Sequence, residues 1–416
     1  MPKPSAWRQL SLVSLLFLAT SSRAVVPWTL QVNTNNVIVV TNAAYGAVGD
    51  GVFTNTAAIQ SAINQAARGG ATNGLSGGTV KIPGPGIYLC GPLNMSNCVN
   101  LQVDAGAVLR MLPYGSYPGA PYRTTDTVAD FISASKLHDI AVSGPGAIDG
   151  QGSPWWPGYK TNNRPVMIYF SGCNRQLIQN ITLSNSPMFH IAIGGGSGNK
   201  TVEGVVIRAP ASSDPVNPSH NTDACNVGGT NILVRNCDIS TGDDDFTCGG
   251  ATFDVLLTNN VYGAGHGVSI GSYTDGGVSN ITVINCSFNG TDNGIRIKSQ
   301  RDRGGLVQNL NYLNLTMTNV DWPLLVYGYY EFGLGTLTGV DPAFAANVAL
   351  TNATTLTSKT PIYRNITFSN IVATMPAGRP PLMVWGLPEA PASNIVFRSV
   401  NITSASSLDP GVYNAT

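Results

Sequence analysis

Charge is scarce in this sequence, and neither sign is in excess. Charged residues make up 11% of the 416 positions, with 22 basic and 22 acidic residues, so the formal net charge is zero. Proteins that bind DNA or RNA along the phosphate backbone usually carry a basic surplus, so we expect no nucleic-acid partner. The hydrophobic content of 43% is too high for a disordered chain. The composition therefore predicts a folded protein outside the nucleic-acid-binding class.

Long hydrophobic runs are also absent, except near the N-terminus. Residues 10–19 are apolar but too few to span a bilayer, and the basic residues Lys3 and Arg8 precede them. Small residues then lead up to Ala24, as they do before a signal-peptidase cleavage site. We therefore predict a secretory signal peptide at residues 1–24, an extracellular protein and no membrane partner.

Metal-binding cysteine patterns are missing as well. The seven cysteines form no Cys-x-x-Cys pair and no cluster with histidine at metal-ligand spacing, so we expect no metal and no cofactor. Export permits disulfides, and Cys90 and Cys98 are close enough in sequence to close a short loop. Because seven is odd, at least one thiol stays unpaired within the chain, and the connectivity is left open.

The periodic patterns of helical solenoids and leucine-rich repeats do not occur, but another repeat does. Short phrases rich in Asn, in which apolar and polar residues alternate, recur along the chain, and such alternation indicates half-buried strands. The spacings of their first apolar positions are 24, 27, 23, 26 and 29 residues. These positions are Ile181, Val205, Ile232, Val255, Ile281 and Leu310. Units that repeat at this period stack into one continuous core.

A right-handed parallel β-helix fits this repeat best. We therefore predict an all-β fold in which short strands form coils stacked about 4.8 Å apart. Asn before each strand suits a tight turn, because Asn tolerates a left-handed backbone, and stacked Asn side chains can form a ladder. No linker-like composition interrupts the chain, so residues 25–416 are predicted to form a single domain, and we expect a monomer.

One segment departs from the strand pattern. Residues 54–67 are rich in Ala and place apolar residues such as Ile59 on one face, which is typical of an amphipathic helix. Thr54, Asn55 or Thr56 is expected to cap it. Because an open solenoid end needs a cover, we predict that this helix closes the N-terminal end of the core.

Acidic residues are concentrated at one place. Asp243, Asp244 and Asp245 are adjacent, although adjacent carboxylates raise the cost of ionising one another. A solvated turn is the plain explanation, and a catalytic centre is the alternative. Asp223 stands 20 residues before Asp243, and His266 stands 22 residues after Asp244, so a solenoid would stack them on successive coils.

Four tripeptides carry a resemblance to a known family. They are Asn221-Thr222-Asp223, Gly242-Asp243-Asp244, Gly265-His266-Gly267 and Arg296-Ile297-Lys298. In this order they resemble the signatures of family 28 of the glycoside hydrolases, the polygalacturonase family, and the similarity extends over most of the predicted mature chain. Any one tripeptide is commonly a turn or a strand with solvated charges. Four of them in order on a β-helix repeat are much more specific.

The resemblance implies an enzyme that hydrolyses α-1,4-galacturonosyl linkages of pectin with inversion at the anomeric carbon. Asp243 is then the general acid, and Asp223 and Asp244 hold and activate the water. Crowding by the other two carboxylates is expected to raise the pKa of Asp243 and keep it protonated. His266 is expected beside the acids, where it tunes their protonation or touches the sugar, and Asn221 is assigned to substrate binding.

The implied substrate is a polymer of galacturonate, each unit of which carries a carboxylate. Arg296 and Lys298 project from the same side of a strand and are suited to bind such carboxylates. Tyr330 matches a family tyrosine that lines the cleavage site, and Tyr327 and Tyr329 are considered as its neighbours.

One acid and several alternatives stand apart from this scheme. Asp245 occupies a position where the family commonly has cysteine, so we expect it to take no part in catalysis, while a backbone bend at Gly242 lets the other two acids share one groove. A hydrolase of rhamnogalacturonan or xylogalacturonan, a calcium-dependent pectate lyase and a non-catalytic β-helix adhesin remain as alternatives. Cutting within the chain or from its ends is undecided, because loops at residues 301–305 and 331–361 would decide it.

Overall fold

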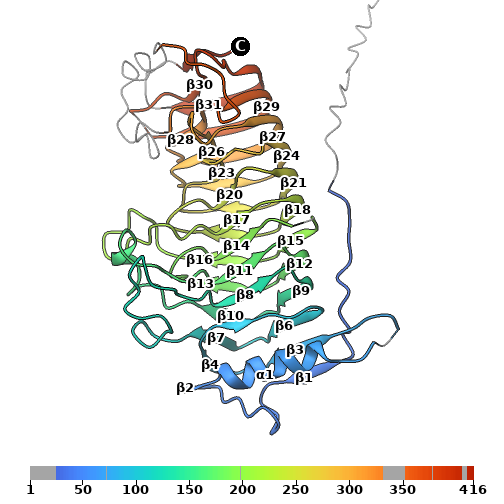
Figure 1. Ribbon diagram of the computed structural model, residues 1–416. Coiled ribbons are helices and arrows are strands. Elements are labelled where there is room, and N and C mark those ends of the chain that lie inside the picture. The colour runs from blue at the N-terminus through green and yellow to red at the C-terminus, as the bar shows by residue number, and fades with distance from the viewer. Residues whose placement is uncertain (1–24, 72, 197, 331–351, 377, 405–409) are drawn as a thin grey trace, which may run out of the picture.

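The structure, a computed structural model, describes residues 25–416 apart from positions 72, 197, 331–351, 377 and 405–409. Over these residues the chain winds into an elongated stack of coils, and each strand pairs in parallel with the equivalent strand of the next coil (Figure 1). The fold is a right-handed parallel β-helix, which confirms the predicted fold class. The predicted signal peptide and most of the loop at residues 331–361 lie outside the described residues.

Two parallel sheets form the walls of the solenoid. The smaller one has 11 strands and carries the residues of interest for function. Its strands are β5 (Leu93–Asn94), β8 (Ile132–Ser135), β11 (Ile168–Ser171), β14 (Ile191–Gly194), β17 (Cys225–Val227), β20 (Phe246–Cys248), β23 (Val268–Ile270), β26 (Asn293–Lys298), β28 (Trp322–Tyr327), β30 (Leu382–Trp385) and β32 (Gly411–Tyr413).

The larger sheet has 21 strands and bends around the other sides of each coil. Its strands are β1 (Val37–Val39), β2 (Asp50–Thr54), β3 (Gly78–Ile82), β4 (Gly86–Cys90), β6 (Val99–Val103), β7 (Ala107–Met111), β9 (His138–Ser143), β10 (Ala147–Asp149), β12 (Asn174–Gln179), β13 (Thr182–Ser184), β15 (Lys200–Glu203), β16 (Val206–Arg208), β18 (Thr230–Arg235), β19 (Asp238–Ser240), β21 (Thr252–Thr258), β22 (Val261–Tyr262), β24 (Val278–Ile284), β25 (Ser287–Asn289), β27 (Leu306–Thr318), β29 (Ile362–Met375) and β31 (Ser393–Ser404). A 3₁₀ turn, η1 (Trp156–Gly158), lies in the loop after β10.

The core consists of columns of apolar side chains that run along the solenoid axis. One column joins buried residues in register from β6 to β29, and each of them stacks on its equivalent one coil away. Its members are Leu101, Val142, Ile178, Val202, Val234, Leu257, Val283, Tyr312 and Phe368. Full burial of such a side chain contributes about 1.5–3 kcal/mol, so the alternation seen in the sequence supplies the main stabilising term.

Asparagine occupies two turns of many coils, which confirms the predicted ladders. In the first ladder, Asn309 has a φ of 57° and donates to Asn280 Oδ1 at 3.3 Å, while Asn365 donates to Asn309 Oδ1 at 3.1 Å. In the second, Asn314 donates to Asn285 Oδ1 at 3.1 Å. Each asparagine therefore supplies both the left-handed turn and a hydrogen bond to the neighbouring coil.

The register of the predicted repeat is wrong at its start. Ile232 pairs with Val255 and continues the first ladder, as expected. Ile181 and Val205 instead precede β13 and β16, which belong to the other turn of their coils. The two turns read alike in sequence because both place Asn before an apolar residue.

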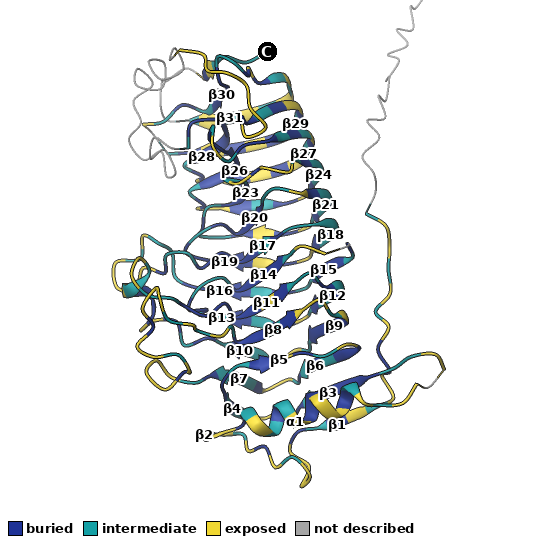
Figure 2. Ribbon diagram, in the orientation of Figure 1, coloured by how far each residue is buried: buried dark blue, intermediate teal, exposed yellow. Residues whose placement is uncertain are grey.

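Helix α1 (Thr56–Ala67) covers the N-terminal end of the core, as predicted (Figures 1 and 2). It buries Ile59 and Ile63 against the first coils and keeps its other face in solvent. Asn55 is the N-cap residue, but its side chain hydrogen-bonds to the backbone of Val48 instead of capping the helix. Among the described helices, none has the length and apolar character needed to cross a bilayer.

The N-terminal arm, residues 25–31, runs along the outside of the larger sheet (Figure 1). Its apolar residues lie over β12, β15, β18 and β21 and line a hollow of about 490 Å³ with them. Val26 exchanges two backbone hydrogen bonds with the Asn231 side chain, at 2.6 and 2.9 Å, and Trp28 Nε1 donates to Thr201 Oγ1 at 3.1 Å. The arm therefore ties together successive coils, and these coils lie far from the arm in the sequence.

All seven cysteines are buried and carry free thiols. Cys90 ends β4 and Cys98 precedes β6, and the short loop between them is not closed by a disulfide.

Candidate active site

The predicted acid residues lie where successive coils enter the 11-stranded sheet. Asp223 precedes β17, the three consecutive acids precede β20, and His266 precedes β23. The backbone amide of Ala224 donates to Asp244 O at 2.9 Å, and that of His266 donates to Asp243 O at 2.8 Å. Three successive coils are thus in direct contact at this corner, so the structure brings the sequence motifs together as stacking predicts.

Close packing at Gly242 shapes the backbone before β20. A side chain there would place its Cβ 2.2 Å from Ser219 O, and the Gly242 amide donates to Thr222 Oγ1 at 2.9 Å. The requirement for glycine is therefore a close backbone approach. The Asp244 amide donates to Asp243 Oδ1 at 2.9 Å, and a carboxylate oxygen of each acid lies within 4.8 Å of the other. The two acids share one side, as predicted.

Asp245 points away from this pair. Its carboxylate is fully buried, accepts a hydrogen bond from the Gly267 amide at 3.0 Å and another from Thr241 Oγ1 at 3.2 Å. Burial raises the pKa of this carboxyl well above its ordinary value, which favours the neutral acid beneath the glycines around His266. The geometry agrees with the prediction that it is separate from the other acids.

His266 lies between two carboxylates. Its Nδ1 is 3.2 Å from Asp243 Oδ1, and its Nε2 is 3.2 Å from Asp292 Oδ2. Burial by itself lowers the pKa of His266, but these two hydrogen bonds outweigh burial and raise the pKa to about 9. At neutral pH the ring is therefore an imidazolium that donates to both acids. Asp292 was not identified in the sequence, although it stands only four residues before Arg296.

Arg296 and Lys298 both bind Asp244. Arg296 Nη2 donates to Asp244 Oδ1, and Lys298 Nζ donates to Asp244 Oδ2 at 3.0 Å. Ser269 Oγ accepts from Arg296 Nε at 3.0 Å and donates to the same Asp244 oxygen at 2.7 Å. The sequence assigned both cations to a substrate carboxylate, whereas the structure gives them an internal partner. Arg296 is only 2% exposed, and its Nη2 also lies 3.3 Å from His266 Nδ1.

The pKa shifts of Asp223, Asp243 and Asp244 differ from the prediction. Burial favours neutral acids, but the two cations hold the pKa of Asp244 below its ordinary value. Burial also acts on Asp243, where the His266 hydrogen bond and nearby positive charges outweigh it and hold the pKa well below its usual range. Burial together with the charges of the other two acids raises the pKa of Asp223 well above its ordinary value. The predicted rise in the pKa of Asp243 is therefore wrong for the unliganded protein.

Asn221 and Arg164 support the acid side of the site. Asn221 has a φ of 57° and donates through Nδ2 to Asp243 Oδ2 at 3.3 Å. Arg164 is 4% exposed and donates to Asn221 Oδ1 at 3.2 Å and to His220 O at 2.9 Å. Sequence reasoning missed Arg164, because no charged partner stands near it in the chain. Asn221, predicted to bind substrate, orients an acid in this structure.

Tyr330, expected to line the cleavage site, lies near Lys298, and Tyr327 is the strand partner of Lys298 in the neighbouring coil. Lys298 Nζ is 5.5 Å from the centre of the half-buried Tyr330 ring. Tyr327 and Tyr329 are fully buried in an apolar cluster with Trp385, so neither ring is free to line a groove.

The remaining histidines lie in different surroundings. His190 is fully buried and its Nδ1 lies 3.1 Å from Thr222 O, which indicates a structural role. His220 stacks on Tyr159 with ring centres 4.3 Å apart. A cation could in principle enter between Asp243, Asp244 and His266. Two protein cations already neutralise Asp244, so this trio is a poor calcium site.

Comparison with known proteins gives a consistent family. The model for glycosyl hydrolases family 28 matches residues 87–414, which include all four tripeptides. An endo-polygalacturonase of Pectobacterium carotovorum subsp. carotovorum is 32% identical over 306 residues, covering 67% of this chain and 73% of the relative. A polygalacturonase of Ralstonia nicotianae is 31% identical over 367 residues, covering 74% and 67%.

Solved structures agree with the β-helix. A polygalacturonase from Erwinia carotovora ssp. carotovora superposes with a TM-score of 0.72 at 25% identity, covering 94% of this chain and 98% of that chain. An endo-xylogalacturonan hydrolase from Aspergillus tubingensis shares the fold, with a TM-score of 0.68 at 20% identity, covering 92% and 96%.

Proposed function

Because the chain belongs to glycosyl hydrolases family 28 and is a glycoside hydrolase of the polygalacturonase type, we propose that it cleaves the α-1,4-galacturonosyl linkages of polygalacturonate with inversion. We further propose that it acts outside the cell after removal of residues 1–24. Membership of a hydrolase family and the internal pairing of Arg296 and Lys298 both speak against a calcium-dependent lyase. A non-catalytic adhesin would not need an ionised acid buried with two cations.

In the proposed reaction, Asp243 gives a proton to the glycosidic oxygen while water attacks the anomeric carbon from the opposite face. The water loses a proton to Asp244 or Asp223, so one proton is delivered and one is accepted. Asp244 is suited to accept, because its two cationic partners keep it ionised. Asp223 shares the water with it from the preceding coil.

The proton on the acid side is held jointly by Asp243 and His266. In the free protein it resides on the imidazolium, 3.2 Å from Asp243 Oδ1. A bound galacturonan brings carboxylates to the groove and excludes water. Both effects favour a neutral Asp243, since they disfavour an additional carboxylate charge. Transfer from Nδ1 to Oδ1 then produces the acid that protonates the leaving group.

Lys298 and Tyr330 are proposed to contact the sugar. Lys298 Nζ has one partner in Asp244 and lies over the Tyr330 ring, so it retains donors for a substrate carboxylate. The ring offers a face on which a sugar can stack. Arg296 is too deeply buried for direct contact and is proposed to hold Asp244 in place.

The observation that carries the proposal is the pairing of two adjacent acids with different partners, Asp243 with an imidazolium and Asp244 with two permanent cations. Two carboxylates in different environments can take the acid and base roles of glycoside hydrolysis.

The experiment that tests this compares Asp243→Asn with Asp245→Asn on polygalacturonate. We expect the first variant to lose about 10²–10⁴-fold in kcat, because the general acid is gone. The second replaces an already neutral group and should retain activity within a few fold. Release of reducing ends measures the rate, and optical rotation of fresh products reports inversion. Equal activity in the two variants, or an ultraviolet-absorbing unsaturated product, would exclude the proposed mechanism.

A further inference from the structure

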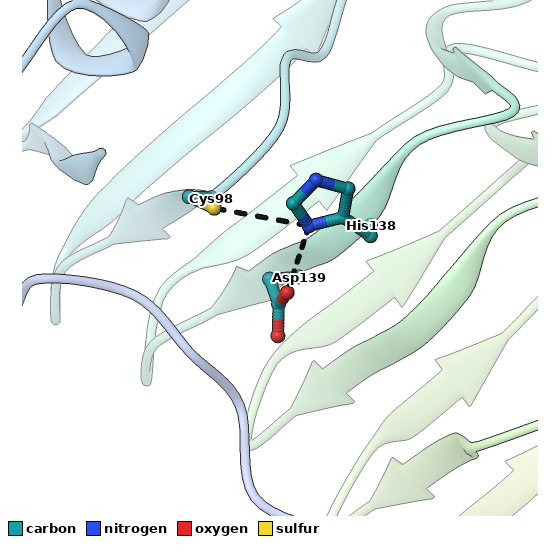
Figure 3. A group of neighbouring side chains, drawn as sticks. All are labelled: Cys98, His138 and Asp139. Carbon is teal, nitrogen blue, oxygen red and sulfur yellow. Dashed lines mark hydrogen bonds and ion pairs between the residues drawn. The ribbon is translucent and has the colours of Figure 1, made fainter. Parts of the chain in front are cut away.

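A second cluster of chemically reactive side chains lies on the outer face of the larger sheet, far along the solenoid from the acids. Cys98 comes from the turn before β6, and His138 and Asp139 begin β9 one coil later. Figure 3 shows the His138 ring with Nδ1 directed at both other side chains. Asp139 follows His138 directly in the chain, whereas Cys98 comes from the preceding coil, so no local sequence pattern indicates the cluster.

These residues interrupt the asparagine ladder. The register of the paired strands shows which residues occupy the turn position taken by asparagines such as Asn231 in later coils. In the earlier coils this position holds Cys98, Asp139 and Arg175. All have a left-handed backbone, with φ of 58° for Cys98, 55° for Asp139 and 52° for Arg175. Asparagine tolerates this conformation better than cysteine or arginine does, so the fold alone gives no reason for either residue here. A conformational cost of this kind is a reason to look for a function.

The three ligand atoms have nearly the spacing of a metal site. His138 Nδ1 is 3.9 Å from Cys98 Sγ and 2.9 Å from Asp139 Oδ2, and all three atoms lie within 4.8 Å of one another. A tetrahedral zinc ion, with bonds of about 2.0–2.3 Å, separates its ligand atoms by roughly 3.5 Å. Movements of about half an ångström would therefore admit the ion, with water in the fourth position.

The surroundings hold the carboxylate and leave an entry path. Asp139 is 1% exposed and accepts from Arg175 and from the Gln31 amide of the N-terminal arm at 2.8 Å. Both of its oxygens are therefore held by neighbouring groups, and Oδ2 also lies 2.9 Å from His138 Nδ1. Cys98 is 6% exposed, whereas the His138 side chain is 49% exposed, so an ion enters past the imidazole.

Charge selects the kind of ion. The guanidinium of Arg175 balances the Asp139 carboxylate, so the cluster is neutral while Cys98 is a thiol. A divalent ion is bound when the thiol releases its proton to solvent, and the cluster then carries one negative charge before the ion is counted. The donor atoms are one sulfur, one imidazole nitrogen and one carboxylate oxygen. Ions that prefer oxygen ligands, such as calcium, bind these donors weakly, whereas ions that favour sulfur and imidazole bind them most tightly.

We propose that Cys98, His138 and Asp139 form a binding site for a thiophilic divalent metal ion of the zinc type. Arg175 and the Gln31 amide orient the carboxylate, as partners of ligating groups commonly do. The site joins two coils and the N-terminal arm, so the bound ion stabilises the N-terminal part of the solenoid. It is independent of the hydrolase site and of the function proposed for it.

The test titrates the chelator-treated, full mature protein with Zn²⁺ by calorimetry and with Co²⁺ by absorption. We expect one site per chain with a thiolate-to-cobalt charge-transfer band. Cys98→Asn restores the ladder residue and should fold normally, yet lose the band and bind Zn²⁺ at least tenfold more weakly. His138→Ala should behave alike. Zn²⁺ should raise the melting temperature of the wild type and not that of Cys98→Asn.

A matched variant separates this site from the acid groove. His266→Gln removes the only histidine of the other candidate trio, and it should keep the cobalt band and the Zn²⁺ affinity. Galacturonan hydrolysis by Cys98→Asn should equal that of the wild type. The proposal is wrong if Cys98→Asn and His138→Ala bind Zn²⁺ like the wild type, or if millimolar Zn²⁺ gives the wild type no saturable binding.

Discussion

Asp243 and Asp244 are neighbours in the chain, but each has its own set of partners. Asp243 contacts groups that titrate or orient, namely His266 and Asn221. Asp244 contacts the cationic side chains of Arg296 and Lys298. Asp243 can therefore exchange a proton with His266, while the cations beside Asp244 favour its ionised form before the reaction begins.

The raised pKa of His266 predicts a loss of stability at alkaline pH. A group whose pKa is raised on folding, here from 6.5 to about 9, contributes stability that is complete below pH 6.5 and is lost as pH rises through 9. The gap in free energy of unfolding between wild type and His266→Gln should therefore shrink over that window by at most about 3 kcal/mol. Urea unfolding at several pH values measures it. A gap that is constant with pH would contradict the assignment of the proton.

The residues that make up the site could be predicted from the sequence, but the directions of their pKa shifts could not. Four tripeptides, spaced about one coil apart in the sequence, were enough to predict that Asp223, Asp243, Asp244 and His266 lie together. Crowding in the sequence suggested a raised pKa for Asp243. The direction of the pKa shift is set instead by an imidazole and two cations, and the register of the coils places these groups beside the acid. Arg164 was missed for a similar reason, since its partners come from loops of later coils.

At the scale of the strand, one core column contains two adjacent buried polar residues. Gln176 and Lys200 lie in register between Ile140 on one side and Ile232 on the other, and both are fully buried. Among the described residues, Lys200 Nζ and Gln176 Oε1 have no hydrogen-bond partner. Burial lowers the pKa of Lys200 to about 8. The pair interrupts an otherwise aliphatic column.

Lys200→Met should therefore stabilise the protein. A lysine whose pKa is lowered from 10.5 to about 8 destabilises the folded state as pH falls through that window, and the full cost persists below it. At neutral pH the variant should gain up to about 3 kcal/mol, and the pH dependence between 8 and 10.5 should disappear. Lys81→Met, at a partly exposed ion pair with Asp104, is the matched control and should change little. A less stable Lys200→Met would show that the amine has an unseen partner.

The asparagine ladder predicts an order of effects at Asn309. Asn309→Ala loses two hydrogen bonds and forces alanine into a left-handed turn, whereas Asn309→Gly loses only the bonds. The free energy of unfolding of Asn309→Ala should therefore be lower than that of Asn309→Gly by about 1 kcal/mol. Both variants should be less stable than the wild type. Asn311→Ala, on the same strand without a left-handed backbone, should stay within about 0.5 kcal/mol. Thermal unfolding measures all three, and a glycine variant less stable than alanine would contradict this reading.

The strands and the capping helix were predictable from local patterns, but the ladder register was not. Alternation and Asn turns mark strands wherever they occur. Each coil has two such turns, however, and Ile181 and Ile232 look equivalent until the pairing is known. Similarly, the capping helix followed from its apolar face, while the role of Asn55 depended on a partner at Val48 that no local rule indicates.

At the scale of the whole molecule, the solenoid is built from contacts between neighbouring coils, and the N-terminal arm is an exception. The arm pairs Val26 with Asn231, 205 positions away. Repeat proteins owe their stability mainly to adjacent units. The arm adds a contact that spans several of these units at once.

Trp28→Ala tests the arm. The variant loses the hydrogen bond to Thr201 and the apolar contact over β12 to β21, so we expect a loss of about 1–2 kcal/mol in stability and a lower melting temperature. Hydrolysis per folded molecule should be unchanged, because the arm lies on another face from the acids. Thr29→Ala, at an exposed arm position, is the control. An unchanged melting temperature for Trp28→Ala would show that the arm does not contribute.

The same contact sets an order of events when the chain is made. The ribosome produces the arm first, yet Asn231 and the strands beneath the arm follow some two hundred residues later. Coils can form one after another during synthesis, but the outer leucines of β18 and β21 stay uncovered until those strands exist and the arm returns to them. The arm is thus synthesised early but is among the last segments to reach its final position.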